Sequence, residues 1–149
     1  MVYRVAYRYL GTAADAEDIA QDVCVTLATK LDRFSGRSRF STWLTSIVIN
    51  RCRDSLRRRT SSARLAEQYV ALRALEDADK ADRVARAEWL NATLQALEPS
   101  LRETVLLVVA EEKSHAEAAD ILGCAESTVS WRMHMAKKAL RAQMDDDDG

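Results

Sequence analysis

The sequence predicts an all-α protein made of two small helical domains joined by a linker. Its 149 residues include one proline and four glycines, so few positions break helices, and 48% of the residues are hydrophobic. Apolar residues recur with a period near 3.6 in several segments, which is the spacing of one buried helix face. We therefore expect no β structure.

Three helical segments are expected in the N-terminal half. Residues 2–10 form a short helix, and Gly11 with Thr12 breaks it. The next helix covers residues 14–31, with one apolar stripe formed by Ile19, Val23, Leu27 and Leu31. Residues 32–38 form a polar loop that contains glycine, serine and arginine. The helical period then resumes from Phe40 to Arg59 through Phe40, Trp43, Leu44, Ile47 and Val48.

The third helix ends in a basic cluster. Five arginines oppose a single acidic residue, Asp54, and these arginines are Arg51, Arg53, Arg57, Arg58 and Arg59. Positive charge suits a helix C-terminus, but this amount exceeds what the helix dipole requires. The cluster therefore indicates phosphate binding.

The composition changes after residue 60. Residues 61–82 have few large apolar side chains and are interpreted as a partly helical linker between a domain at 1–60 and a domain at 83–144. The second domain opens with an apolar face formed by Trp89, Leu90, Leu94 and Leu97. Glu98-Pro99-Ser100 breaks it, and an apolar helix is expected at 101–111. Residues 145–149 are an acidic tail.

Residues 114–141 have the spacing of a helix-turn-helix. Ser114 with Glu117 three positions later is a capping-box signature, and Gly123 can adopt the left-handed backbone of a tight turn. A second helix then restarts with a stripe at Val129, Met133, Ala136 and Leu140. Its exposed side chains can bind phosphates and base edges. The alternative is an ordinary helical hairpin with a solvated basic face.

Charge is segregated along the chain although the formal net charge is only −1. Residues 1–64 carry a net +6, residues 65–98 a net −3 and residues 99–144 a net zero, and the four aspartates of the tail add −4. Phosphate binding depends on the local field, so the basic N-terminal half is compatible with nucleic acid.

Several functional classes lack support in the sequence. There is no Ser-His-Asp arrangement, glycine-rich phosphate loop or HExxH motif, so an enzyme is not expected. The three cysteines lack a CxxC pair, so we expect no metal, cofactor or disulfide, and interpret the cysteines as small buried hydrophobes. No apolar run reaches eighteen residues and no signal pattern begins the chain, so we expect a cytoplasmic protein without membrane insertion.

Two blocks of motifs resemble one family. The first carries Leu10-Gly11, Ala16-Glu17-Asp18, Gln21, Phe40, Trp43-Leu44, Asn50, Asp54, Leu56 and Arg57. The second is residues 94–141, with a leucine, a proline and the helix-turn-helix. In this order and at this spacing the blocks resemble regions two and four of sigma-70 factors of RNA polymerase, in the extracytoplasmic-function (ECF) subfamily. Family members generally carry more helix before Tyr7, so the first helix is expected to be short.

The resemblance implies a role for each part of region two. The helix after Gly11 would contact core RNA polymerase through Asp18, Gln21 and Asp22, although acidic residues are also favoured there by the helix dipole. The loop and following helix would read the minus-10 promoter element, where a base leaves the stack. The candidate contacts are Phe34, Ser35, Arg37, Ser38, Asn50, Arg53 and Arg57. Trp43 is either a wedge at the opened step or a core residue, and we favour the core.

Region four would dock on the minus-35 duplex through the second helix of the helix-turn-helix. The candidate contacts are Glu126, Ser127, Thr128, Ser130, Trp131, Arg132, Lys137, Lys138 and Arg141. The family pattern commonly has a glycine, a basic residue and an arginine where this chain has Ser127, Ser130 and Met135. Two positive charges are missing, so weaker minus-35 binding is expected.

The resemblance implies an alternative sigma factor whose partners are core RNA polymerase, promoter DNA and an anti-sigma factor. Two other interpretations remain. A sigma-like interaction module would bind an anti-sigma factor without recognising a promoter, and the acidic tail favours it slightly. A plain helix-turn-helix repressor would leave the region-two block unexplained.

Overall fold

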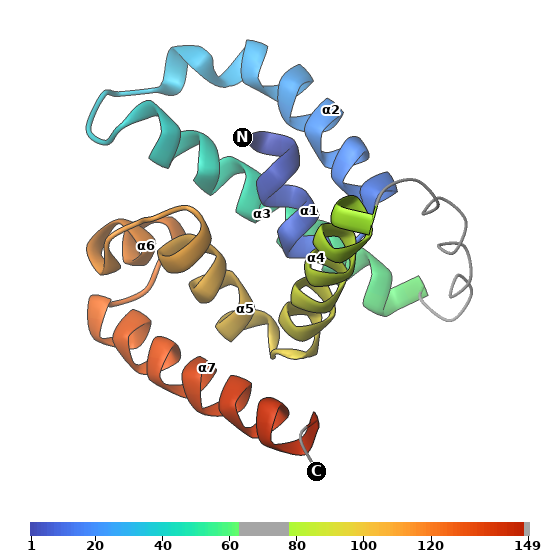
Figure 1. The fold of residues 1–149 in the computed structure, drawn as a ribbon. Helices are drawn as coiled ribbons and strands as arrows, with labels where there is room; N and C mark the ends of the chain where they lie inside the picture. Colours follow the sequence, from blue (N-terminus) through green and yellow to red (C-terminus); the bar gives the residue numbers. More distant parts are fainter. Residues whose placement is uncertain (63–77, 148–149) are drawn as a thin grey trace.

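The computed structural model describes the backbone of residues 1–62 and 78–147 and the side chains of residues 1–59 and 84–144, and this part of the chain is helical without strands. The first group of helices is α1 (Val2–Leu10), α2 (Ala13–Lys30), the 3-10 turn η1 (Leu31–Arg33) and α3 (Phe40–Ser62). The second group (Figure 1) is α4 (Ala78–Ala96), α5 (Pro99–Val105), the π-helical turn η2 (Leu106–Ala110), α6 (His115–Leu122) and α7 (Glu126–Asp147). The all-α prediction is confirmed.

Gly11 ends α1 as the sequence predicted. It adopts a left-handed φ of 83°, and its N–H donates to the Tyr7 carbonyl at 2.8 Å. A Cβ built at this position would lie 2.8 Å from Cδ of Gln95. The glycine therefore serves the turn and also lets α4 approach the end of α1.

The apolar stripe of α3 packs against α1 and α2. Leu44, Ile47 and Val48 are buried as predicted, together with Cys52. Phe40, which the periodicity placed on the same stripe, is instead 42% exposed because it lies at the first residue of the helix, beyond the packed region.

The helix-turn-helix forms with both halves of the predicted capping box. The Ser114 hydroxyl accepts from the Glu117 N–H at 3.1 Å, and the Glu117 carboxylate accepts from the Ser114 N–H at 2.9 Å. Gly123 ends α6 with a φ of 66°. α7 then packs against both α6 and α5, and the buried residues of α6 and α7 include Ile121, Leu122, Val129, Met133 and Ala136.

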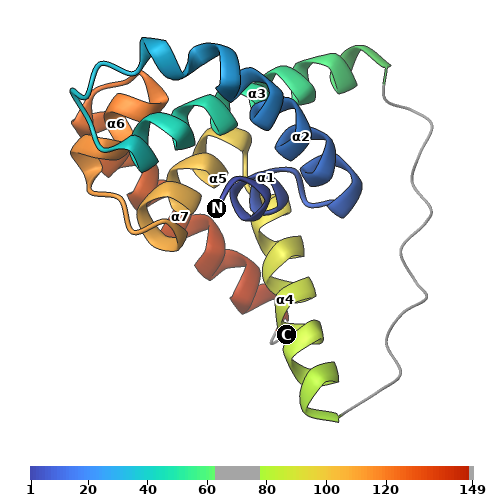
Figure 2. The ribbon, with the colours of Figure 1, turned by 90° about the horizontal axis from the view of Figure 1, so that it is seen from above.

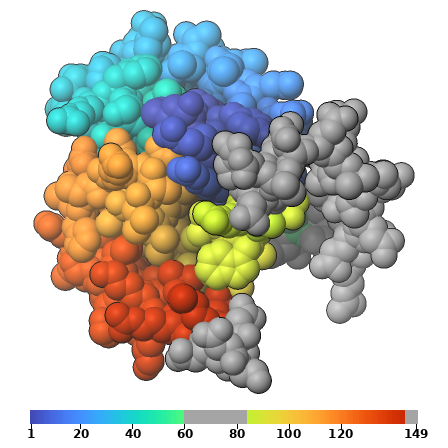
Figure 3. Space-filling view, viewed as in Figure 1, coloured from blue at the N-terminus to red at the C-terminus, as the bar shows by residue number. Residues whose placement is uncertain are grey.

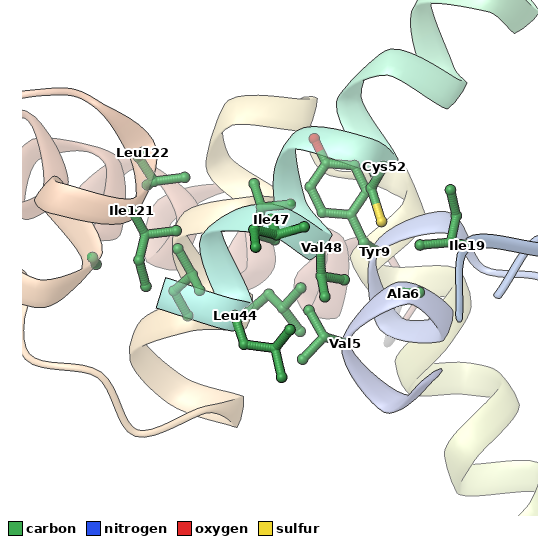
Figure 4. Close-up of a cluster of buried hydrophobic side chains, with 14 of the residues drawn as sticks. Val5, Ala6, Tyr9, Ile19, Leu44, Ile47, Val48, Cys52, Ile121 and Leu122 are labelled. Atoms are coloured by element: carbon green, nitrogen blue, oxygen red, sulfur yellow. The ribbon is translucent and has the colours of Figure 1, made fainter. Parts of the chain in front are cut away.

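One apolar core runs through both groups of helices. Figure 4 shows Val5 of α1 and Leu44 and Ile47 of α3 pointing into the same cluster as Ile121 and Leu122 of α6. In the space-filling view the N-terminal helices lie directly on the C-terminal ones (Figure 3). The two predicted units are thus held in a closed arrangement.

Arg102 of α5 joins the two groups through the ends of two other helices. Its buried guanidinium donates to the carbonyls of Leu94 at 2.9 Å, Gln95 at 2.8 Å and Leu97 at 3.1 Å near the end of α4, and to the Tyr9 carbonyl at 3.2 Å near the end of α1. Helix C-termini carry partial negative charge and unpaired carbonyls, so a buried cation satisfies both. Burial lowers the pKa of Arg102, but a guanidinium remains charged.

Further expectations about buried side chains are wrong. Leu31, which the periodicity placed on the apolar stripe of α2, lies just beyond that helix and is 52% exposed. Trp89 and Leu90 are each 52% exposed, because α4 extends away from the packed helices over most of its length (Figure 2), and only Leu94 and Leu97 near its C-terminal end are buried. Cys24 is exposed on α2, and Cys124 is half-buried, while Cys52 alone is fully buried. Burial raises the pKa of the Cys52 thiol to about 12.

The substitution Arg102→Met should lower the free energy of unfolding by about 3 kcal/mol or more, because it leaves carbonyls of two helix ends buried without a donor. Urea unfolding followed by circular dichroism measures this change. Arg141→Met at an exposed position of α7 is the control and should change stability by no more than about 0.5 kcal/mol. Equal effects of the two substitutions would contradict the role given to Arg102.

The substitution Ser114→Ala should lower the free energy of unfolding by about 1 kcal/mol, because it removes an N-cap acceptor. Hydrogen bonding to the Ser114 backbone lowers the pKa of Glu117 below its usual value of 4.5. The ionised Glu117 therefore stabilises the folded state above that pH, and the contribution is lost as the pH falls through the folded pKa. In acid, the free energy of unfolding should depend less steeply on pH for Glu117→Gln than for the natural chain. An equal pH dependence in the two proteins would argue against the Ser114–Glu117 capping box.

Candidate nucleic-acid interface

The predicted polymerase contacts lie together on one exposed face of α2. The side chains of Asp18, Gln21 and Asp22 are all exposed. Asp22 forms an ion pair with Nε of Arg51 at 3.3 Å, and Asp15 forms one with Arg59. The groove between α2 and α3 therefore has mixed charge and can exchange hydrogen bonds with a polar partner.

Three aromatic rings meet where η1 and the following loop lead into α3. The centroid of the Phe34 ring lies 5.2 Å from that of Trp43 and 5.5 Å from that of Phe40, and the centroids of Phe40 and Trp43 are 5.6 Å apart. Trp43 is half-buried against the core, which is close to the expected core position, while Phe40 faces solvent. Such a cluster offers a face on which an unpaired base can stack.

The polar loop residues lie beside this aromatic cluster of Phe34, Phe40 and Trp43. Ser35, Arg37 and Ser38 are exposed, and Gly36 turns the loop with a φ of 72°. The predicted minus-10 residues of the loop are thus neighbours of an aromatic platform. Hydroxyl and guanidinium donors next to such a platform can bind base edges and phosphates.

The remaining minus-10 candidates lie further along α3 and differ in exposure. Asn50 and Arg57 are exposed, and Arg57 also lies 3.7 Å from Asp54. Arg53 instead turns toward α5, where Nε and Nη2 donate to the Glu103 carboxylate at 2.9 and 2.7 Å. This bidentate pair raises the pKa of Arg53 and occupies the donors that a phosphate would use.

The start of α7 presents the predicted minus-35 residues. Glu126, Ser127, Ser130 and Trp131 are exposed, and Thr128 is half-buried. The Ser130 hydroxyl lies 2.9 Å from Nδ1 of His115 at the start of α6. Exposed hydroxyls and an indole on the second helix of a helix-turn-helix can contact base edges and thymine methyl groups in a major groove.

A basic strip follows on the same helix. It consists of His134, Lys137, Lys138 and Arg141, which line one shallow groove on α7. The two lysines and the arginine are exposed, so they can bind a phosphate backbone. Arg132, by contrast, is half-buried and faces α5, with Nη1 at 3.7 Å from Glu103.

Glu103 of α5 is the centre of an interface that the sequence did not reveal. Glu103 is 5% exposed, and its carboxylate accepts a hydrogen bond from the Tyr9 hydroxyl at 3.0 Å in addition to the two from Arg53. Burial and the neighbouring Glu103 charge raise the pKa of Tyr9, which keeps the phenol protonated as a donor. The available signal for a buried partner was the position of Glu103 two residues before the apolar run from Val105 to Val109.

A second acidic residue binds α1. Glu111 accepts from Nη2 of Arg4 at 2.8 Å and from Nε of Arg4 at 3.1 Å, and it also accepts from Arg8 at 3.3 Å. Its side chain is almost fully covered although it lies just beyond η2. No local sequence pattern indicates this pairing, because more than a hundred residues separate the partners.

Neither metal chemistry nor membrane insertion finds support in the described ranges. Residues 1–59 and 84–144 contain no group of three histidine, cysteine or acidic side chains arranged to hold a metal ion. Within the described helices, no stretch combines the length and apolar character required to cross a bilayer.

Comparison with known proteins identifies both units. Residues 1–62 match the sigma-70 region 2 family, and residues 87–140 match the sigma-70 region 4 family. The ECF RNA polymerase sigma factor SigW of Bacillus subtilis is 31% identical, over 97% of this chain and 83% of that protein. The ECF RNA polymerase sigma-E factor of Escherichia coli is 30% identical, over 89% of this chain and 75% of that protein.

Solved structures agree with the sequence comparisons. The sigma factor RpoE of Bartonella quintana, in complex with the anti-sigma factor NepR, superposes with a TM-score of 0.75 at 25% identity, covering 97% of this chain and 89% of that one. CnrH in complex with the cytosolic domain of CnrY gives a TM-score of 0.73 at 27% identity, covering 98% and 81%. The chain therefore belongs to the sigma-70 family, as an alternative RNA polymerase sigma factor of the ECF type.

Proposed function

We propose that this sigma factor reads its promoter with two separate surfaces, the aromatic cluster with its loop and the exposed side of α7. The observation that carries the proposal is the position of the aromatic cluster. Three rings meet at the start of α3, beside exposed serine and arginine side chains. Sequence-specific reading of unpaired DNA requires this combination of stacking and hydrogen bonding.

At the minus-10 element, an extruded base would stack on Phe34 or Phe40 while Ser35, Arg37 and Ser38 bind its edge and the adjoining phosphates. Flipping a base opposes binding by a few kcal/mol, and stacking on an aromatic ring returns about 1–3 kcal/mol. Asn50, Arg53 and Arg57 follow along α3 and would hold the junction between duplex and single strand. The free energy of binding would thus drive strand opening, without a chemical reaction.

At the minus-35 element, the start of α7 would enter the major groove. Ser127, Thr128, Ser130 and Trp131 are placed to contact bases, with Glu126 and Arg132 beside them. Lys137, Lys138 and Arg141 would bind the phosphate backbone further along the helix. The absence of a basic residue at position 130 is consistent with affinity that relies on this strip.

Core RNA polymerase would bind the exposed face of α2 through Asp18, Gln21 and Asp22. We further propose an anti-sigma factor as regulatory partner and a cytoplasmic location, where polymerase and promoter DNA are found. In support, the sigma factor RpoE of Bartonella quintana described above was solved in complex with the anti-sigma factor NepR. The proposed domains are 1–60 and 83–144, with a linker at 61–82 and a tail at 145–149. Residues 63–77 of this linker lie outside the described structure.

The decisive experiment is run-off transcription with purified core RNA polymerase of the source organism, using DNA from upstream of the protein's own gene. A discrete transcript that depends on the added protein supports the proposal and locates the promoter. Polymerase binding without a transcript on any template would favour the interaction module that does not recognise a promoter. Failure to bind polymerase would overturn the assignment of the α2 surface.

The substitution Phe34→Ala should reduce promoter opening by the reconstituted holoenzyme about tenfold, because it removes roughly 1–3 kcal/mol of stacking. Permanganate reactivity of unpaired thymines measures the opening. Leu31→Ala removes an apolar side chain outside the aromatic cluster that is more exposed than Phe34, and it should leave the reactivity unchanged. Equal losses in both variants would argue against a stacking role for Phe34.

Removal of Lys137, Lys138 or Arg141 should weaken DNA binding uniformly across sequences. Each alanine substitution should lower the slope of log affinity against log salt by about 0.9, because one phosphate contact is lost. Fluorescence anisotropy with a labelled duplex at several salt concentrations measures the slope. Lys30→Ala on α2 supplies the control, and an unchanged slope for the α7 variants would rule out phosphate contacts there.

A further inference from the structure

A hydrogen bond joins the two helices of the helix-turn-helix at the surface assigned to DNA. Nδ1 of His115, the first residue of α6, lies 2.9 Å from the hydroxyl oxygen of Ser130 on α7. His115 is half-buried, whereas Ser130 is exposed among the proposed minus-35 contacts. The imidazole therefore reaches a hydroxyl group that is assigned to reading DNA, although His115 itself lies outside the helix that would enter the groove.

The Ser130 hydroxyl differs from other hydroxyl groups within the helices. Those of Thr26, Thr45 and Thr104 donate to the carbonyl four residues earlier in the same helix, at 2.7, 2.7 and 2.8 Å. Such a bond turns a hydroxyl back onto its own backbone. The described hydrogen bond of Ser130 runs instead to the imidazole of the neighbouring helix. Its remaining hydrogen-bonding sites are therefore held at an exposed position of α7 by a residue of α6.

Local structure holds both members of the pair in place. The capping box of Ser114 and Glu117 fixes the first turn of α6, which carries His115. Val129, the neighbour of Ser130, is fully buried and anchors the beginning of α7. Side chains that are ordered in advance lose little conformational entropy when a partner binds. The orientation of the Ser130 hydroxyl is thus set before DNA binds.

A serine hydroxyl needs such a partner to discriminate between bases. It has one donor and two acceptor sites, so a freely rotating hydroxyl can serve a donor or an acceptor on a base edge. If Nδ1 of His115 accepts the Ser130 proton, the hydroxyl can only accept, from the amino groups of adenine or cytosine. If Nδ1 carries a proton, the hydroxyl oxygen accepts it, and the Ser130 proton is free for acceptors such as guanine O6 or thymine O4. In each state the imidazole fixes where the Ser130 proton lies.

We propose that His115 is a positioning residue for base reading, which fixes the hydroxyl proton of Ser130 and with it the base that Ser130 prefers in the minus-35 duplex. This inference rests on the proposed function of α7. Loss of the imidazole nitrogen would free the hydroxyl to rotate, so that Ser130 would serve donors and acceptors alike. Discrimination at the base pair that faces Ser130 should then fall, whereas discrimination at the other positions should persist.

The test uses holoenzyme reconstituted from core RNA polymerase and the full chain. A pool of random-sequence duplexes is enriched by binding to it, and sequencing gives the ratio of the preferred base to the other bases at each position. His115→Phe keeps a ring but removes Nδ1, and His115→Asn keeps a polar atom near the place of Nδ1. Thr93→Ala is the control, because it removes a hydroxyl that donates to the Trp89 carbonyl of its own helix.

The natural chain, Thr93→Ala and His115→Asn should enrich the same sequence. His115→Phe and Ser130→Ala should each lower the base preference at one and the same position about fivefold, as expected for the loss of one directed hydrogen bond. The double variant should lose no more than Ser130→Ala alone, since both changes remove the same contact. Far-ultraviolet circular dichroism verifies folding. His115→Gln, whose amide lies beyond the place of Nδ1, should give the same loss if His115→Phe fails to fold.

Three outcomes would overturn the inference. Either His115→Phe or Ser130→Ala could keep the natural base preference, or the two could alter different positions. His115→Phe could also lower the slope of log affinity against log salt by about 0.9 with the preference kept, which would make His115 a phosphate contact. Failure of the natural holoenzyme to enrich any sequence upstream of the minus-10 element is a separate result. It would reject the proposed function of α7, whereas a preference that survives His115→Phe rejects only the positioning role.

Discussion

The buried guanidinium of Arg102 sets the relation between the two units of this sigma factor. It binds carbonyls near the C-terminal ends of α1 and α4, which belong to different units, and it does so from α5. A buried charge is tolerated there because the helix ends supply several acceptors and a favourable dipole. Since Glu103 is the next residue on the same short helix, the position of Arg102 also determines where the Glu103 carboxylate lies, between Tyr9, Arg53 and Arg132.

This arrangement explains how a chain with a formal net charge of −1 can serve as a DNA-binding protein. Positive charge is concentrated at the end of α3 and along α7, where the local field matters. In the closed form part of that charge is neutralised by Glu103 and Glu111, whereas the strip of Lys137, Lys138 and Arg141 stays exposed. The same acidic residues that lower the net charge therefore organise the interface between the units.

Much of the fold was predictable because its signals are local. The left-handed glycines at 11 and 123, the capping box at Ser114 and the 3.6-residue apolar stripes each depend on residues within a few positions of one another. The predicted boundaries of α2 and α6 agree with those of the structure to within one or two residues. The errors concern burial: Leu31, Phe40, Trp89 and Leu90 follow the helical period but are exposed in the structure.

The sequence by itself determined the helical class, the two blocks of motifs and the positions of most exposed candidate contacts, because periodicity, caps and motif spacing are properties of neighbouring residues. Only the tertiary structure decided that Phe34, Phe40 and Trp43 form one aromatic cluster and that Arg53 is covered. The Arg53–Glu103 pair joins residues fifty positions apart, and the Arg4–Glu111 pair joins residues more than a hundred apart. No local rule specifies such partners, since they depend on how the apolar faces of α1, α3 and α6 meet in one core.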